Sequence, residues 1–314
     1  MSAANRALAI IDPTVTEQPA LERARWFARK TGAALELFIC EYDQYLAGER
    51  FFDSASLTRA RKSLMSSHER RLNKLAEDIC EDGIDVSVDA QWDHPLHDGI
   101  VRKVLRSKPD MVFKDTHYHT AIKRSLFSNT DWNLIRNCPT PLWLVKPAEI
   151  GEQISIIAAV DPVHERDKPA ELDHRILAVA RQLRDQLHGR LSVLHAFDPS
   201  PAYAVSADSM AFPISAPMNE MMEALKNKHK QAVAELMQGQ GVAAEDIHVV
   251  EGDTRELLIA LAEQVDANLV IMGAVSRGIL RRLVLGSTAE RVLDHVPCDL
   301  LIVKPSDFET DVDA

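Results

Sequence analysis

The sequence predicts two tandem α/β domains, each a doubly wound, mainly parallel sheet covered by helices on both faces. Three observations predict this fold. The chain has 314 residues, enough for two domains of ordinary size. Its strand-like runs are apolar throughout and alternate with helical patterns, which is typical of parallel sheets buried on both faces. The third observation is that one half of the chain repeats the other.

The repeat is visible at both ends of each half. A short apolar run closes with Asp-Pro at Pro13 and again at Pro162, 149 residues later. The sequence NCPTPLWLVKP, which ends at Pro147, aligns with HVPCDLLIVKP, which ends at Pro305, at an offset of 158 residues. The second half therefore carries a net insertion of nine residues, and the two domains are related by internal duplication.

This duplication gives the expected domain boundaries. We expect one domain at 1–148, a second at 152–308 and an acidic tail at 309–314, with the join where Pro and Gly break structure. The nine extra residues are best placed in the Pro-, Ser- and Ala-rich stretch 198–217, as a loop over the mouth of the second domain.

In the first half, strands and helices are expected to alternate from the start. A helix at 17–31 has an apolar face that includes Leu21, Ala24 and Ala28, and Gly32 supplies its left-handed stop. The first expected strand ends at Ile11, and the others cover Leu35–Ile39, Ile84–Val88, Met111–Phe113 and Leu142–Val145. A long helix includes Leu64–Ile79, and two further helices cover 96–106 and 131–137.

The second half repeats the same order of elements. The expected strands are Ile156–Val160, Leu191–Leu194, Ile247–Val250, Leu269–Met272 and Leu300–Val303, and the expected helices cover 169–187, 218–238, 254–265 and 288–295.

Composition excludes several classes of protein. The net charge is −11 and there is no long basic run, so neither a nucleic acid nor an anionic membrane surface is expected as a partner. Four cysteines without a C-x-x-C pair do not form a disulfide framework. No apolar run reaches the 18 residues that span a bilayer, and no signal peptide is recognisable, so we expect a cytoplasmic protein.

The candidate ligand site lies at the carboxyl ends of the strands. In an open α/β sheet, ligands bind there at the point where the strand order reverses. This rule selects Asp12 and Asp161, and the segments that follow Phe113 and Met272.

The segment after Met272 contains two features of an anion site. Gly273 closes the strand, and a loop with three arginines leads to Gly286-Ser287-Thr288 at the start of a helix; the arginines are Arg277, Arg281 and Arg282. Free amides and the positive end of the helix dipole would meet a phosphate at this point. Alternatively, Ser287 and Glu290 form a capping box that only stabilises the helix.

The same residues resemble the nucleotide-binding signature of the universal stress protein family: Gly, two residues, Gly, nine residues, then Gly-Ser or Gly-Thr. Gly273, Gly286 and Ser287 fit this pattern, but Ser276 stands where the second glycine is expected. The segment Thr130–Trp143 is similar to the tandem-domain members of the family. The resemblance covers both halves of the chain, and it implies the adenine nucleotide alpha hydrolase-like version of the doubly wound fold.

The resemblance further implies that the second domain binds ATP or a related adenine nucleotide. It also implies stress-linked signalling with little turnover, and a role in survival of stress such as DNA damage. The residues that it assigns to nucleotide binding, or that belong to the same loop, are Asp161, Ala196, Met272, Gly273, Ser276, Arg277, Gly286, Ser287 and Thr288. If position 276 needs a positive φ, serine costs about 1–2 kcal/mol there, which weakens binding roughly tenfold.

The first domain has lost the glycines of the motif. The corresponding residues are Asp115, Tyr118, Ser128 and Asn129. Asp115 would bring a carboxylate near a phosphate, and Asp131 could satisfy the free amides of the following helix itself. We expect this domain to bind no nucleotide in the family's manner and to serve as a structural or partner-binding half.

Other functions stay open. His94, His97, His117 and His119 are weak candidates for zinc ligands, although ordinary loop histidines explain them as well. No catalytic residues are identifiable, and slow ATP hydrolysis stays open. The alternatives are a scaffold whose halves pack on each other, with protein partners or as a homodimer, and a binder of another small ligand.

Overall fold

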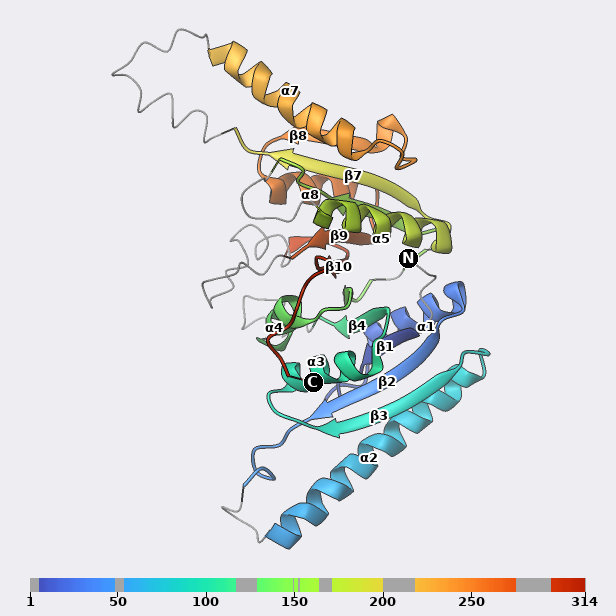
Figure 1. Ribbon diagram of the computed structural model, residues 1–314. Coiled ribbons are helices and arrows are strands. Elements are labelled where there is room, and N and C mark those ends of the chain that lie inside the picture. Colours follow the sequence, from blue (N-terminus) through green and yellow to red (C-terminus); the bar gives the residue numbers. More distant parts are fainter. Residues whose placement is uncertain are drawn as a thin grey trace, which may run out of the picture. The chain divides into compact units, whose positions relative to one another are not determined.

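The computed structural model describes residues 6–48, 54–116, 129–148, 150–151, 153–163, 171–199, 218–274 and 295–313 (Figure 1). They form two compact units. Unit 1 combines Met1–Glu149 with Asp299–Ala314, and unit 2 is Ile150–Cys298. Each unit is a mainly parallel sheet with helices packed against it, so the predicted pair of doubly wound α/β domains is confirmed.

Unit 1 contains six of the strands. Its elements are β1 (Arg6–Ile10), α1 (Pro19–Thr31), β2 (Ala34–Glu41), α2 (Ser54–Cys80), β3 (Val86–Trp92), α3 (Leu96–Ser107), β4 (Met111–Asp115), α4 (Asn129–Asn137), β5 (Leu142–Val145) and β10 (Asp299–Val303).

Helix α1 shows how local sequence sets an element's limits. Pro19 occupies its first turn, where a missing amide hydrogen costs nothing. Gly32 ends it in the left-handed conformation, with φ of 73°, and donates its amide hydrogen to the carbonyl of Ala28 at 2.8 Å. The predicted stop is therefore confirmed. On the buried side, the Phe27 ring lies 5.4 Å from that of Phe113, which anchors α1 to the sheet.

The strands of unit 1 lie in the order β3-β2-β1-β4-β5-β10. The chain first steps outward from β1 to β3 and then returns past β1 to β4, so the order reverses between β1 and β4. Right-handed crossovers place α1 and α2 on one face of the sheet and α3 and α4 on the other. Helices α3 and α4 do pack against each other (Figure 1).

The last strand of unit 1 comes from the end of the second sequence repeat. β10 pairs antiparallel with β5, with Leu301 opposite Trp143. The sequence placed this strand in the second domain, at 152–308, but its contacts put it in unit 1.

A buried carboxylate fixes β10 to its neighbours. Asp299 is 1% exposed and accepts hydrogen bonds from Trp143 Nε1 at 2.8 Å and from the Lys146 amide at 2.9 Å. Arg23 Nε of α1 lies 2.8 Å from its Oδ2. Burial raises the pKa of Asp299 to about 6, although Arg23 and the two hydrogen bonds act in the opposite direction.

Unit 2 repeats the design with strands in the order β9-β6-β7-β8, and every described pair is parallel. Its elements are β6 (Ser155–Ala159), α5 (Glu171–Leu187), β7 (Arg190–Phe197), α7 (Met218–Leu236), the short 3-10 helix η1 (Ala244–Asp246), β8 (Ile247–Glu251), α8 (Thr254–Gln264) and β9 (Leu269–Gly273). Figure 1 shows α7 running alongside β8, the edge strand.

Two expected elements lie largely outside the described residues. They are the insertion at 198–217, of which 198–199 are described, and the helix at 288–295, of which only His295 is described. Within the part of the chain that the structure describes, no helix is both long and apolar enough to cross a membrane.

Candidate functional site

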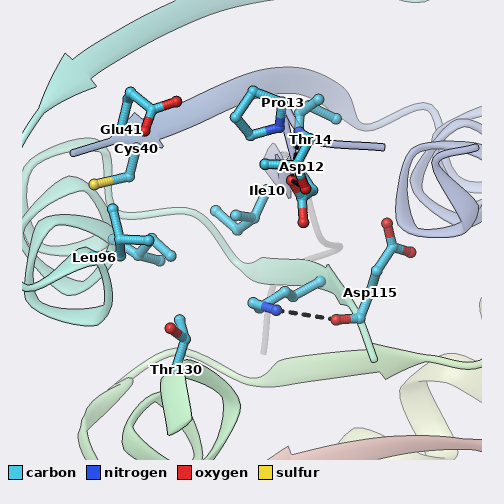
Figure 2. A pocket seen from close by; sticks show the side chains of 12 residues that line it. Ile10, Asp12, Pro13, Thr14, Cys40, Glu41, Leu96, Asp115 and Thr130 are labelled. Atoms are coloured by element: carbon cyan, nitrogen blue, oxygen red, sulfur yellow. Dashed lines mark hydrogen bonds between the residues drawn. The ribbon is translucent and has the colours of Figure 1, made fainter. Parts of the chain in front are cut away.

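A cavity of about 240 Å³ lies at the carboxyl edge of unit 1, where the strand order reverses (Figure 2). Aliphatic side chains from β1 and α3 form its apolar part, and the ends of β1, β2 and β4 add polar groups. The lining residues are Ile10, Ile11, Asp12, Pro13, Thr14, Cys40, Glu41, Leu96, Ile100, Lys114, Asp115 and Thr130. This is the place that the strand-end rule predicted.

Asp12 is built into a tight turn after β1. Its Oδ1 accepts hydrogen bonds from the Thr14 amide at 2.7 Å and from Thr14 Oγ1 at 2.6 Å. The buried Gln18 side chain accepts from the Asp12 amide at 3.1 Å and donates to the Asp12 carbonyl at 2.7 Å. Arg71 of α2 donates to the next carbonyls along the chain, including Pro13 at 2.5 Å. The turn is thus held rigidly at the mouth of the cavity.

Lys114 places a cation in the cavity wall, but this cation is already paired. Its Nζ lies 2.5 Å from Oδ1 of Asp131 at the start of α4 and donates to the Asp115 carbonyl at 3.0 Å, the bond drawn in Figure 2. Asp131 is completely buried and Lys114 is 6% exposed. In unit 2 the residue 158 positions after Lys114 is Met272, so this ion pair is particular to unit 1.

Asp115 closes β4 and binds the start of α1. It is 5% exposed, and its Oδ1 accepts the Ala20 amide hydrogen. The carboxylate thereby meets the positive end of the helix, which would otherwise attract an anion. The predicted carboxylate is present, but it is directed to the protein's own helix.

Gly273 holds the same position in unit 2 and has a packing role. A Cβ added there would lie 2.6 Å from Cδ2 of Leu172, which is the second residue of α5 as Ala20 is of α1. Unit 1 therefore combines a large strand-end residue with a small helix residue, and unit 2 combines the opposite sizes. This packing explains Gly273 without a ligand.

The opposite wall of the unit 1 cavity is formed by Cys40 and Glu41 of β2. A Cβ on Gly99 would lie 2.5 Å from Cys40 Sγ, so α3 approaches this wall closely. Burial, helped by the negative charges of Asp93 and Glu41, raises the pKa of Cys40 to about 12, and its thiol is protonated at neutral pH. Glu41 Oε2 lies 3.1 Å from Nε2 of His68 on α2.

In unit 2 the strand ends bring together three of the predicted ligand residues. Ala158 is paired with Ile271 of β9, and Ala159 with Leu194 of β7. Asp161, Ala196 and Met272 therefore lie at the same edge of the sheet, at or just after the ends of their strands. The Asp161 side chain is 40% exposed, and its amide donates to Asp173 Oδ1 of α5 at 3.0 Å.

Two histidines lie next to the strand ends that form this edge. His195 of β7 is 1% exposed, and its Nδ1 lies 3.1 Å from the Val160 carbonyl. Its Nε2 lies 2.7 Å from Nδ1 of His229 on α7. The His229 ring also stacks on Phe197, with centroids 4.3 Å apart.

The remaining predicted ligand residues of unit 2 lie outside the described residues. They are Ser276, Arg277, Gly286, Ser287 and Thr288. Their assignment to a phosphate site stays a prediction.

The zinc prediction concerns four histidines, two of which are described. His94 stacks on Tyr42 at 4.0 Å between ring centroids, and His97 Nε2 lies 3.5 Å from Asp98 Oδ1. His117 and His119 lie outside the described residues. Among the side chains that the structure does place, no group of three or more His, Cys, Asp or Glu residues is arranged to hold a metal ion.

Comparison with known proteins assigns the family. The sequence profile described as the universal stress protein family matches residues 4–146 and 156–304, once in each half. The chain belongs to the universal stress protein family. The predicted resemblance and the internal duplication are both confirmed, and the family is one of stress response.

Universal stress proteins of several bacteria are similar to this chain over nearly its whole length. Universal stress protein E of Escherichia coli K12 is 28% identical over 307 residues, covering 98% of this chain and 96% of the relative. The universal stress protein E homolog of Haemophilus influenzae is 25% identical and covers 95% and 97%. A putative universal stress protein of Pseudomonas aeruginosa UCBPP-PA14 superposes with a TM-score of 0.73 at 26% identity, covering 97% and 95%.

Sequence reasoning missed several residues of this universal stress protein's two edges. Lys114, Glu41 and His195 belong to strands and each directly follows an apolar run. A charged or imidazole side chain at such a position needs a partner. A polar side chain beside an apolar run was therefore the available signal. It does not identify the partners, which lie on other elements: Asp131, His68 and His229.

Proposed function

We propose that unit 2 of this universal stress protein binds ATP or a related adenine nucleotide at its carboxyl edge, as part of a cytoplasmic role in survival of stress such as DNA damage. The observation that carries the proposal is the convergence of Asp161, Ala196 and Met272 where β6 lies between β7 and β9. This is the switch point of the sheet, where doubly wound folds bind ligands.

The chemistry of the adjoining sequence supports an anionic ligand at this edge. The segment after Gly273 contains Arg277 and leads to Gly286-Ser287-Thr288, which together offer guanidinium and backbone donors for phosphate. The segment is locally basic although the overall charge is −11.

Unit 1 is a poor site for a phosphate by comparison. The α1 N-terminus is bound by Asp115 and the Lys114 ammonium by Asp131, so two groups that could hold an anion already have carboxylate partners. We therefore assign nucleotide binding to unit 2 alone.

The duplication offers a matched pair of variants for the test. Equilibrium dialysis with ATP should show that Asp161→Asn weakens binding at least tenfold, because the carboxylate lies beside the adenosine in this proposal. Asp12→Asn changes the corresponding residue of unit 1 and should leave binding unchanged. Absence of retained ATP at millimolar concentration, or equal effects of the two variants, would contradict the proposal.

A second candidate function is a non-catalytic scaffold with a vestigial nucleotide site. The packing of Gly273 against Leu172 favours it, because the glycine is needed whether or not a ligand binds. Native mass spectrometry of freshly purified protein separates the two functions: a bound adenine nucleotide supports the first. No ligand, together with unchanged stability of Gly286→Val, supports the second.

A further inference from the structure

The two histidines behind the unit 2 edge form a hydrogen-bonded chain with a defined direction. The Val160 carbonyl is only an acceptor, so His195 Nδ1 must carry the hydrogen that is donated to it at 3.1 Å. In neutral His195, Nε2 is then an acceptor, and His229 Nδ1 must donate across the 2.7 Å contact. When both rings are neutral, this arrangement fixes both tautomers.

The hydrogen bond between His195 and His229 tolerates one added proton but not two. If either ring becomes an imidazolium, one nitrogen of the contact still donates and the other still accepts, after a tautomer change in the second ring where needed. If both rings are charged, two N–H groups face each other across 2.7 Å and two like charges share one part-buried site. The contact must then open.

Charged groups around the pair follow β6 or lie on α5, α7 and β8. Asp161 Oδ1, after β6, lies 3.8 Å from His195 Nδ1. Asp173 of α5 holds the Asp161 amide, Lys228 of α7 precedes His229, and Glu251 of β8 is the register partner of Phe197. Burial, followed by the charges of His195 and Lys228, lowers the pKa of His229, against the effect of Asp161.

The pair is mechanically connected to the candidate ligand residues. His195 holds the carbonyl of Val160, the residue before Asp161, and is itself the residue before Ala196. Phe197, the next residue of β7, stacks on the other ring. Opening of the contact would therefore remove the support that His229 gives to the His195 ring, which holds the Val160 carbonyl, and to Phe197 at the end of β7.

We propose that His195 and His229 form a proton-sensitive lock that positions Asp161 and Ala196, so that unit 2 binds its ligand only while the pair holds at most one added proton. The effect on a ligand depends on the proposed function, whereas the lock itself is a property of the ligand-free protein.

Unit 1 provides the matched control. His68 lies on its long helix α2, as His229 lies on α7, but it faces the carboxylate of Glu41 at 3.1 Å. A carboxylate partner accepts from an imidazolium, so protonation of His68 does not bring two donors together.

The first experiment uses the ligand-free protein. Hydrogen exchange at pH 7.5 and 5.5, corrected for intrinsic rates, should show that amides 158–162 and 194–197 lose at least tenfold in protection at the lower pH. In His229→Asn, whose side-chain amide donates or accepts by rotating and takes up no proton, this loss should disappear. His68→Asn should keep the loss. Equal protection at both pH values in the wild-type protein would overturn the lock.

The second experiment uses adenosine, which does not change charge in this pH range. Its affinity should fall at least fivefold from pH 7.5 to 5.5 in wild type and in His68→Asn, but not in His229→Asn. An equal fall in all three proteins overturns the proposal. If adenosine binds at neither pH, the ATP dialysis decides whether the proposed function holds, and the exchange result alone decides whether the lock exists.

Discussion

Asp115 Oδ1 accepts a hydrogen bond from the backbone amide of Ala20, 95 residues earlier in the chain. The equivalent strand end in unit 2 is Gly273, which packs against Leu172 at the equivalent place on α5. The same junction between a strand end and a helix start is therefore filled by a different pair of residues in each repeat: a large strand residue with a small helix residue in unit 1, and the reverse in unit 2. Exchanging one member of a pair should be more harmful than exchanging both.

The Gly273 junction gives the first prediction. Gly273→Ala should destabilise the protein by about 1–3 kcal/mol, because its methyl group would overlap Leu172. The double variant with Leu172→Ala should show a favourable coupling energy, since the smaller helix residue makes room. Urea unfolding measures both quantities. Gly48→Ala is the control, because a Cβ there meets nothing within 4 Å; an equal effect of that variant would refute the explanation.

The Asp115 junction gives the second prediction. Asp115→Ala removes an acceptor from the first turn of α1 and should cost about 0.5–2 kcal/mol. Asp115→Asn retains an acceptor oxygen and should cost less. Thermal unfolding can compare these with Asp110→Ala, which removes a carboxylate bond to the Arg6 amide on the exposed surface and should cost below about 0.5 kcal/mol. A larger loss at Asp110 would contradict the assignment.

The buried pair Lys114 and Asp131 gives the third prediction. Lys114→Met should destabilise by about 3–5 kcal/mol, because the completely buried Asp131 loses its cation. The double variant Lys114→Met with Asp131→Ala introduces the residues found 158 positions later, Met272 and Ala289. It should recover most of the loss, as measured by chemical unfolding. If the double variant is as unstable as the single one, pairing is not the reason for the loss.

Lys304 gives a prediction about pH. It is 1% exposed, its Nζ has no hydrogen-bond partner among the described residues, and it lies 4.6 Å from the centre of the Phe308 ring. Burial lowers its pKa to about 8 from 10.5. Between these two values the unfolded chain binds more protons than the folded protein, so the free energy of unfolding should rise with pH from about 8 to about 10.5.

Replacement of this lysine tests that sign. Lys304→Met should stabilise the protein by about 1–3 kcal/mol at pH 7, since it removes the cost of burying a charge and loses only the contact with a ring. Its unfolding free energy should also be flatter above pH 8. The exposed Lys30→Met should leave the wild-type slope intact. A steeper slope in Lys304→Met would show that another group titrates.

Features that depend on neighbouring residues could be predicted from the sequence. The stop at Gly32, the strand ends before Asp12 and Asp161, and the repeated order of elements follow from local periodicity and from turn chemistry. The position of the two candidate site edges follows from topology, because parallel strands end at one side of a sheet.

Features that join distant elements could not be predicted in this way. Lys103 on α3 reaches Glu36 on β2 at 2.6 Å and Asp89 on β3 at 2.7 Å, and no spacing in the sequence indicates these partners. The same holds for His195 with His229, and for Asp299, whose partners Arg23 and Trp143 lie in the other repeat. Each of these contacts depends on how the elements pack in three dimensions.

The pairing of β5 with β10 has a consequence for biosynthesis. The sheet of unit 1 is complete only when Asp299–Val303 has joined strand Leu142–Val145. At roughly 5–20 residues per second, the ribosome needs about 8–30 s to make the intervening chain. During that time β5 presents an unpaired edge and Arg23 lacks its carboxylate partner. The free edge of β5 is then available to chaperones. It can also pair wrongly with the final strand of another copy of the chain.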